Sequence, residues 1–301
     1  MDNLSKRGRV VAFYNRKGGV GKTTLSGNFA ALMAKKGRVS GSKVLYLDFD
    51  TQSNSSGCFL GFSDEYLKQD PGTYPNLLSM VGVHIPSIDI SKMPVLSLVQ
   101  KANLNLYTIA QHKEMELLFS KAYGEDYDIF TEPFKELRKE YDWIILDLPC
   151  AQDTTTRSAL AASDYLIMPL GASRESTQYL PEFMTEHLPI IKAYNENLVF
   201  LGMVHNLADR YTANLYDHEY KNKSKEFGVY LYKAKIRSSV GLRDINSDDE
   251  KSLKARSKMN RCVVACDNFI FKTYPKAFQD FEDFASETLS LIKKAEKKGD
   301  K

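Results

Sequence analysis

Short apolar runs alternate along this chain with longer stretches in which apolar residues recur at helical spacing. Helices are expected at about 22–36, 132–140 and 276–297. Runs of strand length lie at 10–14, 44–47, 104–109, 143–146, 165–169 and 198–204. A last run, 229–236, alternates between apolar and polar residues, as expected of an edge strand. Because strands separated by helices form parallel sheets, the pattern predicts an α/β fold with a mostly parallel central sheet and helices on both faces.

The length of 301 residues fits one elaborated α/β domain as well as it fits two domains. We predict a single domain over 1–301, with a core of about 8–295. The stretch 61–103 is weakly patterned and contains several prolines, so it is expected to be a variable insert of short helices and loops. A lysine-rich tail, 293–301, ends the chain.

A glycine-rich run follows the first predicted strand directly and opens the first predicted helix. Successive backbone N–H groups of such a run can surround an anion, and the following helix turns its positive end toward the same point. Lys22 is therefore expected to reach the β- and γ-phosphates of a nucleotide, and the Thr23 hydroxyl to bind Mg²⁺. The alternative is a plain glycine turn with two solvated lysines. The run is Lys17-Gly18-Gly19-Val20-Gly21-Lys22-Thr23-Thr24.

Three aspartates stand at the ends of predicted strands. Asp48 and Asp50 follow the second strand, and Asp147 follows the run 143–146. The carboxyl ends of parallel strands meet at one edge of the sheet, where ligands bind. We therefore expect these carboxylates to converge on the glycine-rich loop.

The glycine-rich run departs from the strict pattern G-x-x-x-x-G-K-[ST], because Arg16 holds the first glycine position. It resembles the deviant Walker A motif of the ParA/MinD superfamily. The resemblance implies a P-loop NTPase fold, and a Lys17 that crosses a dimer interface to contact the phosphates held by the other subunit. Asp147 resembles the Walker B aspartate, which would hold Mg²⁺ through a water while Thr23 binds the metal directly.

The segment after the second strand resembles the D-x-D-P-Q segment of the same superfamily. Its second aspartate orients the attacking water, so Asp50 is the expected hydrolytic residue, acting with Asp48, Lys17 and Lys22. Thr51 stands where the superfamily has proline and Ser53 where it often has glycine, which leaves the hydrolysis rate open. An aspartate that only caps a turn is the alternative for Asp50.

Asn206 matches an asparagine that contacts the adenine in the superfamily, and a plain turn asparagine is the alternative. The resemblance implies ATP and Mg²⁺ as cofactors and a nucleotide-dependent homodimer.

A basic stripe is the best sequence clue to what this protein acts on. Lys251, Lys254, Lys258 and Arg261 are spaced three, four and three residues apart, so a helix would place them on one face. Two stripes on a dimer would bind DNA without sequence preference. The alternative is a solvated helix face, because the net charge is only +3.

We therefore expect a ParA-type ATPase that acts in partition or positioning of a plasmid, chromosome or other cargo, with a stimulating adaptor of the ParB type. The short polar start of the chain is unlike a signal peptide, and no apolar run is long enough to span a membrane. The four cysteines show no metal or disulfide pattern. These features favour a cytoplasmic protein that does not bind membranes, and the DNA binding expected of a ParA-type ATPase implies association with the nucleoid.

Two alternatives stay open. The first is a MinD-like membrane-associated regulator, against which no apolar residue larger than alanine follows Ile292. The second is a nucleotide-gated scaffold with negligible hydrolysis, which the departures at Thr51 and Ser53 allow.

Overall fold

The computed structural model describes residues 8–35, 41–50, 105–108, 127–208, 215–238 and 275–299, together with the backbone of 96–97. In these ranges the strands form an eight-stranded sheet of order β3-β4-β2-β5-β1-β6-β7-β8. Seven of the strands are parallel, and β3 pairs antiparallel with β4 at one edge. The strands are β1 (Arg9–Phe13), β2 (Val44–Asp48), β3 (Leu96–Ser97), β4 (Leu106–Thr108), β5 (Trp143–Asp147), β6 (Tyr165–Leu170), β7 (Val199–Ala208) and β8 (Leu231–Arg237).

The central strands are apolar along their whole length because both of their faces are covered. In β1, Val10 and Ala12 belong to one hydrophobic core, while Val11 and Phe13 belong to the other. Successive side chains of a strand point to opposite faces, so each strand contributes to two cores. This explains why the central runs show no polar alternation, whereas β8, the last strand in the sheet order, does.

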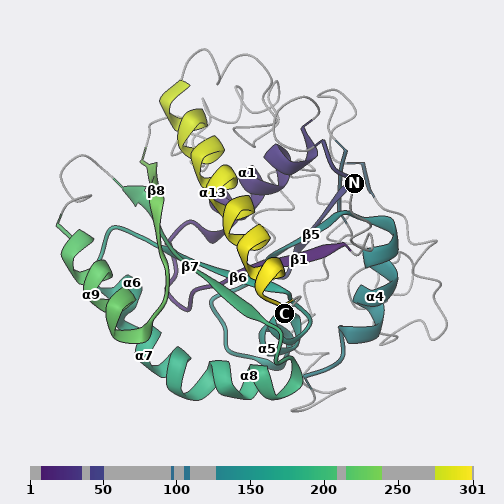
Figure 1. Ribbon diagram of the computed structural model, residues 1–301, viewed down its shortest axis with the longest axis horizontal. Helices are drawn as coiled ribbons and strands as arrows, with labels where there is room; N and C mark the ends of the chain where they lie inside the picture. The colour runs from purple at the N-terminus through teal and green to yellow at the C-terminus, as the bar shows by residue number, and fades with distance from the viewer. Residues whose placement is uncertain are drawn as a thin grey trace, which may run out of the picture.

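Helices lie on both faces of the sheet (Figure 1). One face carries α1 (Lys22–Ala34) and α13 (Pro275–Gly299), and α1 is buried between the sheet and α13. The Phe29 and Phe284 rings of these two helices lie 5.7 Å apart. The other face carries α4 (Thr131–Glu140), α5 (Thr154–Ala161), α6 (Glu175–Gln178), α7 (Leu180–Glu182), the π-helical turn η3 (Phe183–His187), α8 (Leu188–Tyr194) and α9 (Asp217–Phe227).

The predicted α/β class with a mostly parallel sheet is confirmed. The lysine-rich tail is not separate from the last helix, since α13 continues to Gly299 and includes residues 293–299. Helices at 154–161, 175–194 and 217–227 were not predicted, and their sequences are polar or interrupted by proline. The predicted insert, 61–103, lies outside the described residues apart from β3. None of the described helices is both long enough and apolar enough to cross a membrane.

Candidate nucleotide-binding site

The ends of three neighbouring strands bring the predicted carboxylates beside the glycine-rich loop. Asp147 is the register partner of Phe13 in β1 and of Asp48 in β2. Both aspartates are fully buried at this carboxyl edge of the sheet. The loop begins at Tyr14, immediately after β1, and ends where α1 begins. Two distant parts of the sequence therefore meet at the loop, as predicted.

The loop has the backbone expected of an anion-binding turn. Gly19 and Gly21 have φ values of 73° and 77°, a left-handed conformation that favours glycine. A Cβ atom at Gly19 would meet nothing within 4 Å, whereas one at Gly21 would lie 2.4 Å from the Asn206 side-chain nitrogen. Within the described residues, the N–H groups of Gly18 and Gly19 donate to no protein acceptor. The loop therefore keeps backbone donors available for an anion at the start of α1.

Asn15 fixes the first half of the loop. Its Oδ1 accepts from the backbone N–H of Lys17 at 2.9 Å. Its Nδ2 donates to the carbonyl of Pro169 at 2.8 Å and to that of Ser176 at 3.1 Å. The side chain is completely buried. Sequence reasoning missed this residue, although a polar amide directly after an apolar strand was a signal.

Asn206 fixes the second half of the loop. From β7 its Nδ2 donates to the carbonyls of Val20 and Gly21, at 2.9 and 3.0 Å. Its Oδ1 is buried and has no hydrogen-bond partner among the described residues. The following residue, Leu207, has a φ of 54°, which is uncommon for a residue with a side chain. Asn206 is therefore part of the loop's support, and its contact with an adenine stays a prediction.

Lys22 is held at the mouth of the loop and is almost completely buried. Its Nζ donates to the carbonyl of Asn15 at 3.1 Å and to the Sγ of Cys150 at 2.9 Å. Cys150 is half-buried, and its Sγ lies 3.8 Å from where a Cβ of Gly18 would be. A thiol is thus part of the site, which the cysteine pattern alone gave no reason to expect.

A chain of buried hydroxyl groups lies behind Asp147. The Tyr46 hydroxyl donates to Oδ2 of Asp147 at 3.1 Å, and it lies 3.0 Å from Oγ of Ser26 on α1. Asp48 accepts from the backbone N–H of Asp50 at 3.0 Å. Carboxylates and a hydroxyl are the ligands that Mg²⁺ prefers. Asp147, Asp48 and the half-buried Thr23 at the start of α1 therefore suit this ion chemically.

The residues expected to act on the outer side of the site are accessible. Lys17 is exposed, and Asp50 is partly buried at the end of a described range. Arg16, which replaces the usual glycine, turns to α7 instead, where it pairs with Glu182 at 3.1 Å and lies over the Tyr179 ring. Thr24, the last residue of the motif, is half-buried in α1.

Some of the predicted residues lie outside the described part of the chain. These are Thr51, Ser53 and the basic stripe of Lys251, Lys254, Lys258 and Arg261.

The parallel sheet, the left-handed glycines and the converging carboxylates define a P-loop nucleotide-binding protein. Residues 8–200 match a family model, AAA_31, described as an AAA domain, and the chain belongs to this family. It is a P-loop ATPase of the ParA/MinD type, as the sequence resemblance predicted.

Its relatives agree with this assignment. The chain is 26% identical to the sporulation initiation inhibitor protein Soj of Bacillus subtilis over 240 residues, which cover 80% of this chain and 88% of that protein. It is 27% identical to the chromosome-partitioning ATPase Soj of Treponema pallidum over 277 residues, which cover 86% and 98%. Identity to the chromosome partitioning protein ParA of Myxococcus xanthus is 28% over 206 residues, which cover 67% and 66%.

Solved structures share the fold. A complex of Cyanothece McdA with ATP superposes with a TM-score of 0.68 at 18% identity, covering 95% of this chain and 98% of McdA. Cobyrinic acid a,c-diamide synthase from Mycobacterium smegmatis, with bound ADP and magnesium, has a TM-score of 0.65 at 17% identity and covers 95% of each chain. These likenesses concern the fold alone.

Proposed function

We propose that this protein binds ATP with Mg²⁺, dimerises through its nucleotide sites and hydrolyses ATP as a switch in partition or positioning of DNA or another cargo. The observation that carries the proposal is the position of Lys17. Its side chain is exposed on a loop whose other lysine, Lys22, is buried at the phosphate position. One lysine thus suits the chain's own nucleotide, and the other suits a nucleotide held by a second chain. The relatives named as partition proteins, and the McdA complex with ATP, support the same proposal.

The chain's own residues act mainly by positioning. Backbone N–H groups of the loop and the Lys22 ammonium hold the phosphates, while Asn15 and Asn206 keep the loop in shape. Asp147 and Thr23 would hold Mg²⁺, which neutralises charge on the β- and γ-phosphates when bound. Asp50 would orient the attacking water, and Lys17 of a second subunit would add positive charge at the γ-phosphate.

Dimerisation and hydrolysis are tested with Lys17→Ala and Asp50→Ala. Sedimentation with ATP and Mg²⁺ should show a dimer for the unaltered protein and a monomer for Lys17→Ala, while both retain fluorescent ATP analogue binding. Asp50→Ala should prolong the dimer and slow phosphate release. A Lys17→Ala protein with normal dimerisation and turnover would contradict the switch mechanism. Normal dimerisation with no measurable phosphate release by the unaltered protein would favour a nucleotide-gated scaffold.

DNA binding is tested with duplex DNA at low and high salt, and with anionic vesicles in parallel. We expect ATP-dependent, salt-sensitive DNA binding that Lys254→Glu with Lys258→Glu weakens without changing ATP affinity. The control is Lys135→Glu with Lys139→Glu, which makes the same charge change on the exposed face of α4. Binding to vesicles and not to DNA would favour the membrane-associated alternative.

A further inference from the structure

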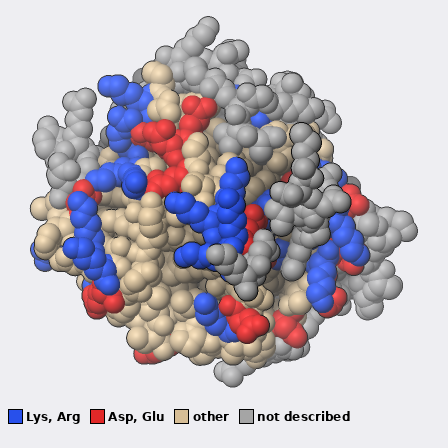
Figure 2. Space-filling model, in the orientation of Figure 1, with Lys and Arg blue, Asp and Glu red and all other residues tan. Residues whose placement is uncertain are grey.

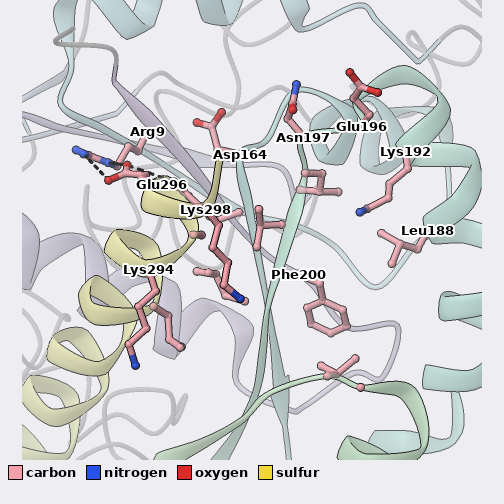
Figure 3. A pocket seen from close by; sticks show the side chains of 18 of the residues that line it. Arg9, Asp164, Leu188, Lys192, Glu196, Asn197, Phe200, Lys294, Glu296 and Lys298 are labelled. Atoms are coloured by element: carbon pink, nitrogen blue, oxygen red, sulfur yellow. Dashed lines mark hydrogen bonds and ion pairs between the residues drawn. The ribbon is translucent and has the colours of Figure 1, made fainter. Parts of the chain in front are cut away.

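A second concave site lies at the amino edge of the sheet, opposite the phosphate loop. Its volume is about 910 Å³, within the range of small-molecule sites. The walls come from the starts of β6 and β7, from α8, from the turn between α9 and β8, and from the C-terminal end of α13 (Figure 3). Nothing in the proposed ATPase mechanism uses this groove.

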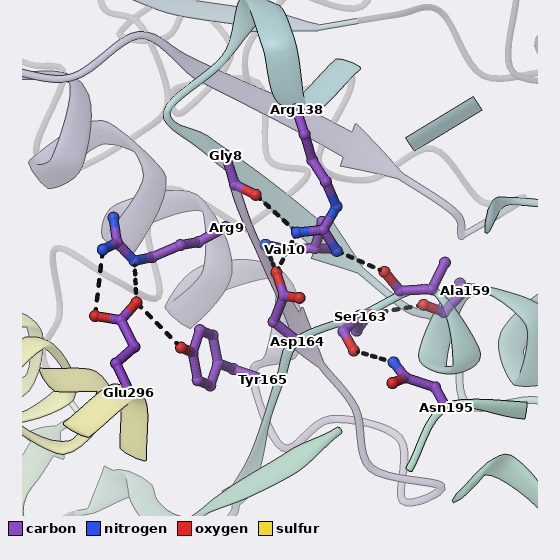
Figure 4. Close-up of polar contacts among 11 residues, drawn as sticks. Gly8, Arg9, Val10, Arg138, Ala159, Ser163, Asp164, Tyr165, Asn195 and Glu296 are labelled. Carbon is purple, nitrogen blue, oxygen red and sulfur yellow. Dashed lines mark hydrogen bonds and ion pairs between the residues drawn. The ribbon is translucent and has the colours of Figure 1, made fainter. Parts of the chain in front are cut away.

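The buried charges beside the groove belong to the fold (Figure 4). The Arg138 guanidinium, which is nearly fully buried, donates to the Gly8 carbonyl at 2.7 Å, to the Ala162 carbonyl at 3.1 Å and to Asp164. The Asp164 carboxylate also accepts from the backbone N–H of Val10 at 2.8 Å. These groups are satisfied by one another, so they hold β1, α4 and β6 together.

A second pair closes the same edge beside α13. Arg9 donates to Glu296 at 2.6 Å, and the Tyr165 hydroxyl donates to the same carboxylate at 3.3 Å. The hydrogen bond to Glu296 raises the pKa of Arg9, and burial followed by the Glu296 charge raises the pKa of Tyr165. Arg9 is therefore a charged partner of Glu296, and its charge is compensated within the protein.

The surface left to a ligand is apolar with a basic rim. Met184, Phe200 and Phe227 extend from the core on one face of the sheet, and Leu291 and Ala295 from the core on the other. All five are only partly buried. The groove therefore lies where the two cores meet at the sheet edge, and it offers apolar side chains from both.

Lysines complete the walls. On the α8 side Met184, Leu188 and Lys192 follow one another at intervals of four residues, which places them on one helix face. On α13 the face toward the groove carries Lys294 and Lys298. In Figure 3, Lys192 and Lys298 lie on opposite sides of the Phe200 ring.

The free charge of the groove is positive. Lys192, Lys294 and Lys298 form no ion pair with any described residue. Among the described residues that line the groove, Glu196 is the only carboxylate outside the two ion-pair clusters. Figure 2 shows blue side chains grouped around the C-terminal end of α13.

We infer that this groove binds a discrete anionic amphiphile, with a compact aryl or acyl body and one carboxylate, sulfonate or phosphate group. The apolar body would cover Phe200, Phe227 and Leu291, and the anion would lie between lysines of α8 and α13. A groove receives a discrete molecule, whereas a flat bilayer cannot enter it. A peptide would bring backbone N–H groups, for which the described lining offers few side-chain acceptors besides the ion-paired Asp164 and Glu296, namely Glu196 and Asn197.

The test uses the full chain and two probes, the fluorescent sulfonate 1-anilinonaphthalene-8-sulfonate and sodium decanoate below its micelle concentration. We expect one saturable fluorescence site per chain, from which decanoate displaces the sulfonate. Lys294→Gln with Lys298→Gln should raise the dissociation constant by about fivefold or more. The matched control, Lys293→Gln with Lys297→Gln, removes the same charge from residues of α13 that do not line the groove, and should change it by less than twofold.

Two further variants test whether the probes bind in the groove and not at the phosphate loop. Ala295→Phe should fill part of the groove and weaken both probes, and circular dichroism would show that the variant is folded. Lys22→Ala should leave probe binding unchanged, because the phosphate loop lies at the other edge. The inference is overturned if both lysine pairs weaken binding equally, if Lys22→Ala abolishes it, or if no saturable site exists. Weaker binding of the Lys294→Gln with Lys298→Gln variant to vesicles of phosphatidylcholine and phosphatidylglycerol, without decanoate binding by the unaltered protein, would overturn the inference and assign the lysines to a lipid surface instead.

Discussion

The two edges of the sheet both bury charged side chains, but they treat them differently. At the amino edge, Arg138 finds two backbone carbonyls and the Asp164 carboxylate, so its charge is compensated within the protein. At the carboxyl edge, Lys22 contacts one carbonyl and one thiol, beside loop N–H groups that have no protein acceptor in the described residues. A buried charge with complete partners stabilises the fold. A buried charge beside backbone donors that have no protein acceptor is available to bind a ligand.

The direction of the strands explains why charges are compensated at the amino edge and left for a ligand at the carboxyl edge. Each parallel strand ends at the carboxyl edge, and the helix that follows begins there. The positive end of α1 and the loop before it therefore face this edge, while at the amino edge helices end and strands begin. Completeness of partners, and not burial alone, should therefore separate charged residues that stabilise the fold from those that bind a ligand.

Arg138→Met should have the largest effect on stability. It removes a donor from two backbone carbonyls and leaves Asp164 with the Val10 N–H but no cation, and breaking such a buried pair costs about 3 kcal/mol. Urea unfolding should show this loss, while ATP affinity of the folded protein changes less than about twofold. Lys139→Met, on the same helix, removes an exposed pair with Glu136 and should cost no more than about 1 kcal/mol. If the two variants were equally stable, the ion pair at the amino edge would not hold the fold.

The sequence predicted the features that lie within one short segment of the chain. Continuous apolar runs predicted the central strands, and the ends of these strands predicted that Asp48 and Asp147 would lie beside the glycine-rich loop that leads to Lys22, because motif and strand end are adjacent in the chain. The positive-φ glycines are also local features, so the loop followed from its own sequence.

Individual side-chain contacts between distant segments could not be predicted. The supports of the loop, Asn15 to Ser176 and Asn206 to Val20, join residues more than a hundred positions apart. The same is true of Lys22 to Cys150 and of the groove, whose walls come from separate elements. The helices at 175–194 were missed because Pro181 and Pro189 interrupt their pattern, although both prolines lie at first-turn positions.

Lys22→Met should have the largest effect on nucleotide binding. A charge-assisted hydrogen bond to a phosphate contributes about 1.5–3 kcal/mol, so ATP affinity should fall by about 10–100-fold. The free energy of unfolding should change by less than about 1 kcal/mol, because few protein contacts are lost. Calorimetric titration and urea unfolding measure the two quantities. Lys43→Met, whose exposed side chain pairs with Glu140 at the amino edge, is the control and should leave affinity unchanged. A large loss of stability in Lys22→Met would mean that this lysine serves the fold.

Tyr46→Phe should have a smaller effect, confined to the metal. The Tyr46 hydroxyl orients the Asp147 carboxylate, and groups that orient a metal ligand change metal affinity by about tenfold. A magnesium titration with a fluorescent ATP analogue should show weaker Mg²⁺ dependence, with nucleotide binding in EDTA unchanged. The control is Tyr165→Phe, which removes a buried hydroxyl at the amino edge. Equal magnesium affinity in both variants would mean that the Tyr46 hydroxyl does not orient a magnesium ligand. The comparison of the two edges would then depend on Lys22 alone.

Asp217 is the converse case. It lies near the carboxyl ends of β7 and β8, where ligands bind, but its charge has complete partners within the protein. Lys235 donates to its two oxygens at 2.6 and 2.5 Å, and His205 Nδ1 lies 3.6 Å away. Burial opposes ionisation, but the hydrogen bond and charge of Lys235 prevail and hold the pKa of Asp217 below its ordinary value of 3.8. Its contribution to stability is therefore complete above that value and is lost as the pH falls through the lowered pKa.

Asp217→Asn should accordingly lower the free energy of unfolding by no more than about 1 kcal/mol at neutral pH, because the carboxylate is partly exposed. The difference from the unaltered protein should shrink in acid, and ATP affinity should not change. Urea unfolding between neutral and acidic pH measures the difference, with Asp217→Asn combined with Lys235→Met to show that Lys235 is its source. A difference that grew in acid would contradict the sign of the shift. A loss of ATP affinity would show that position at the carboxyl edge, and not completeness of partners, decides which charges serve function.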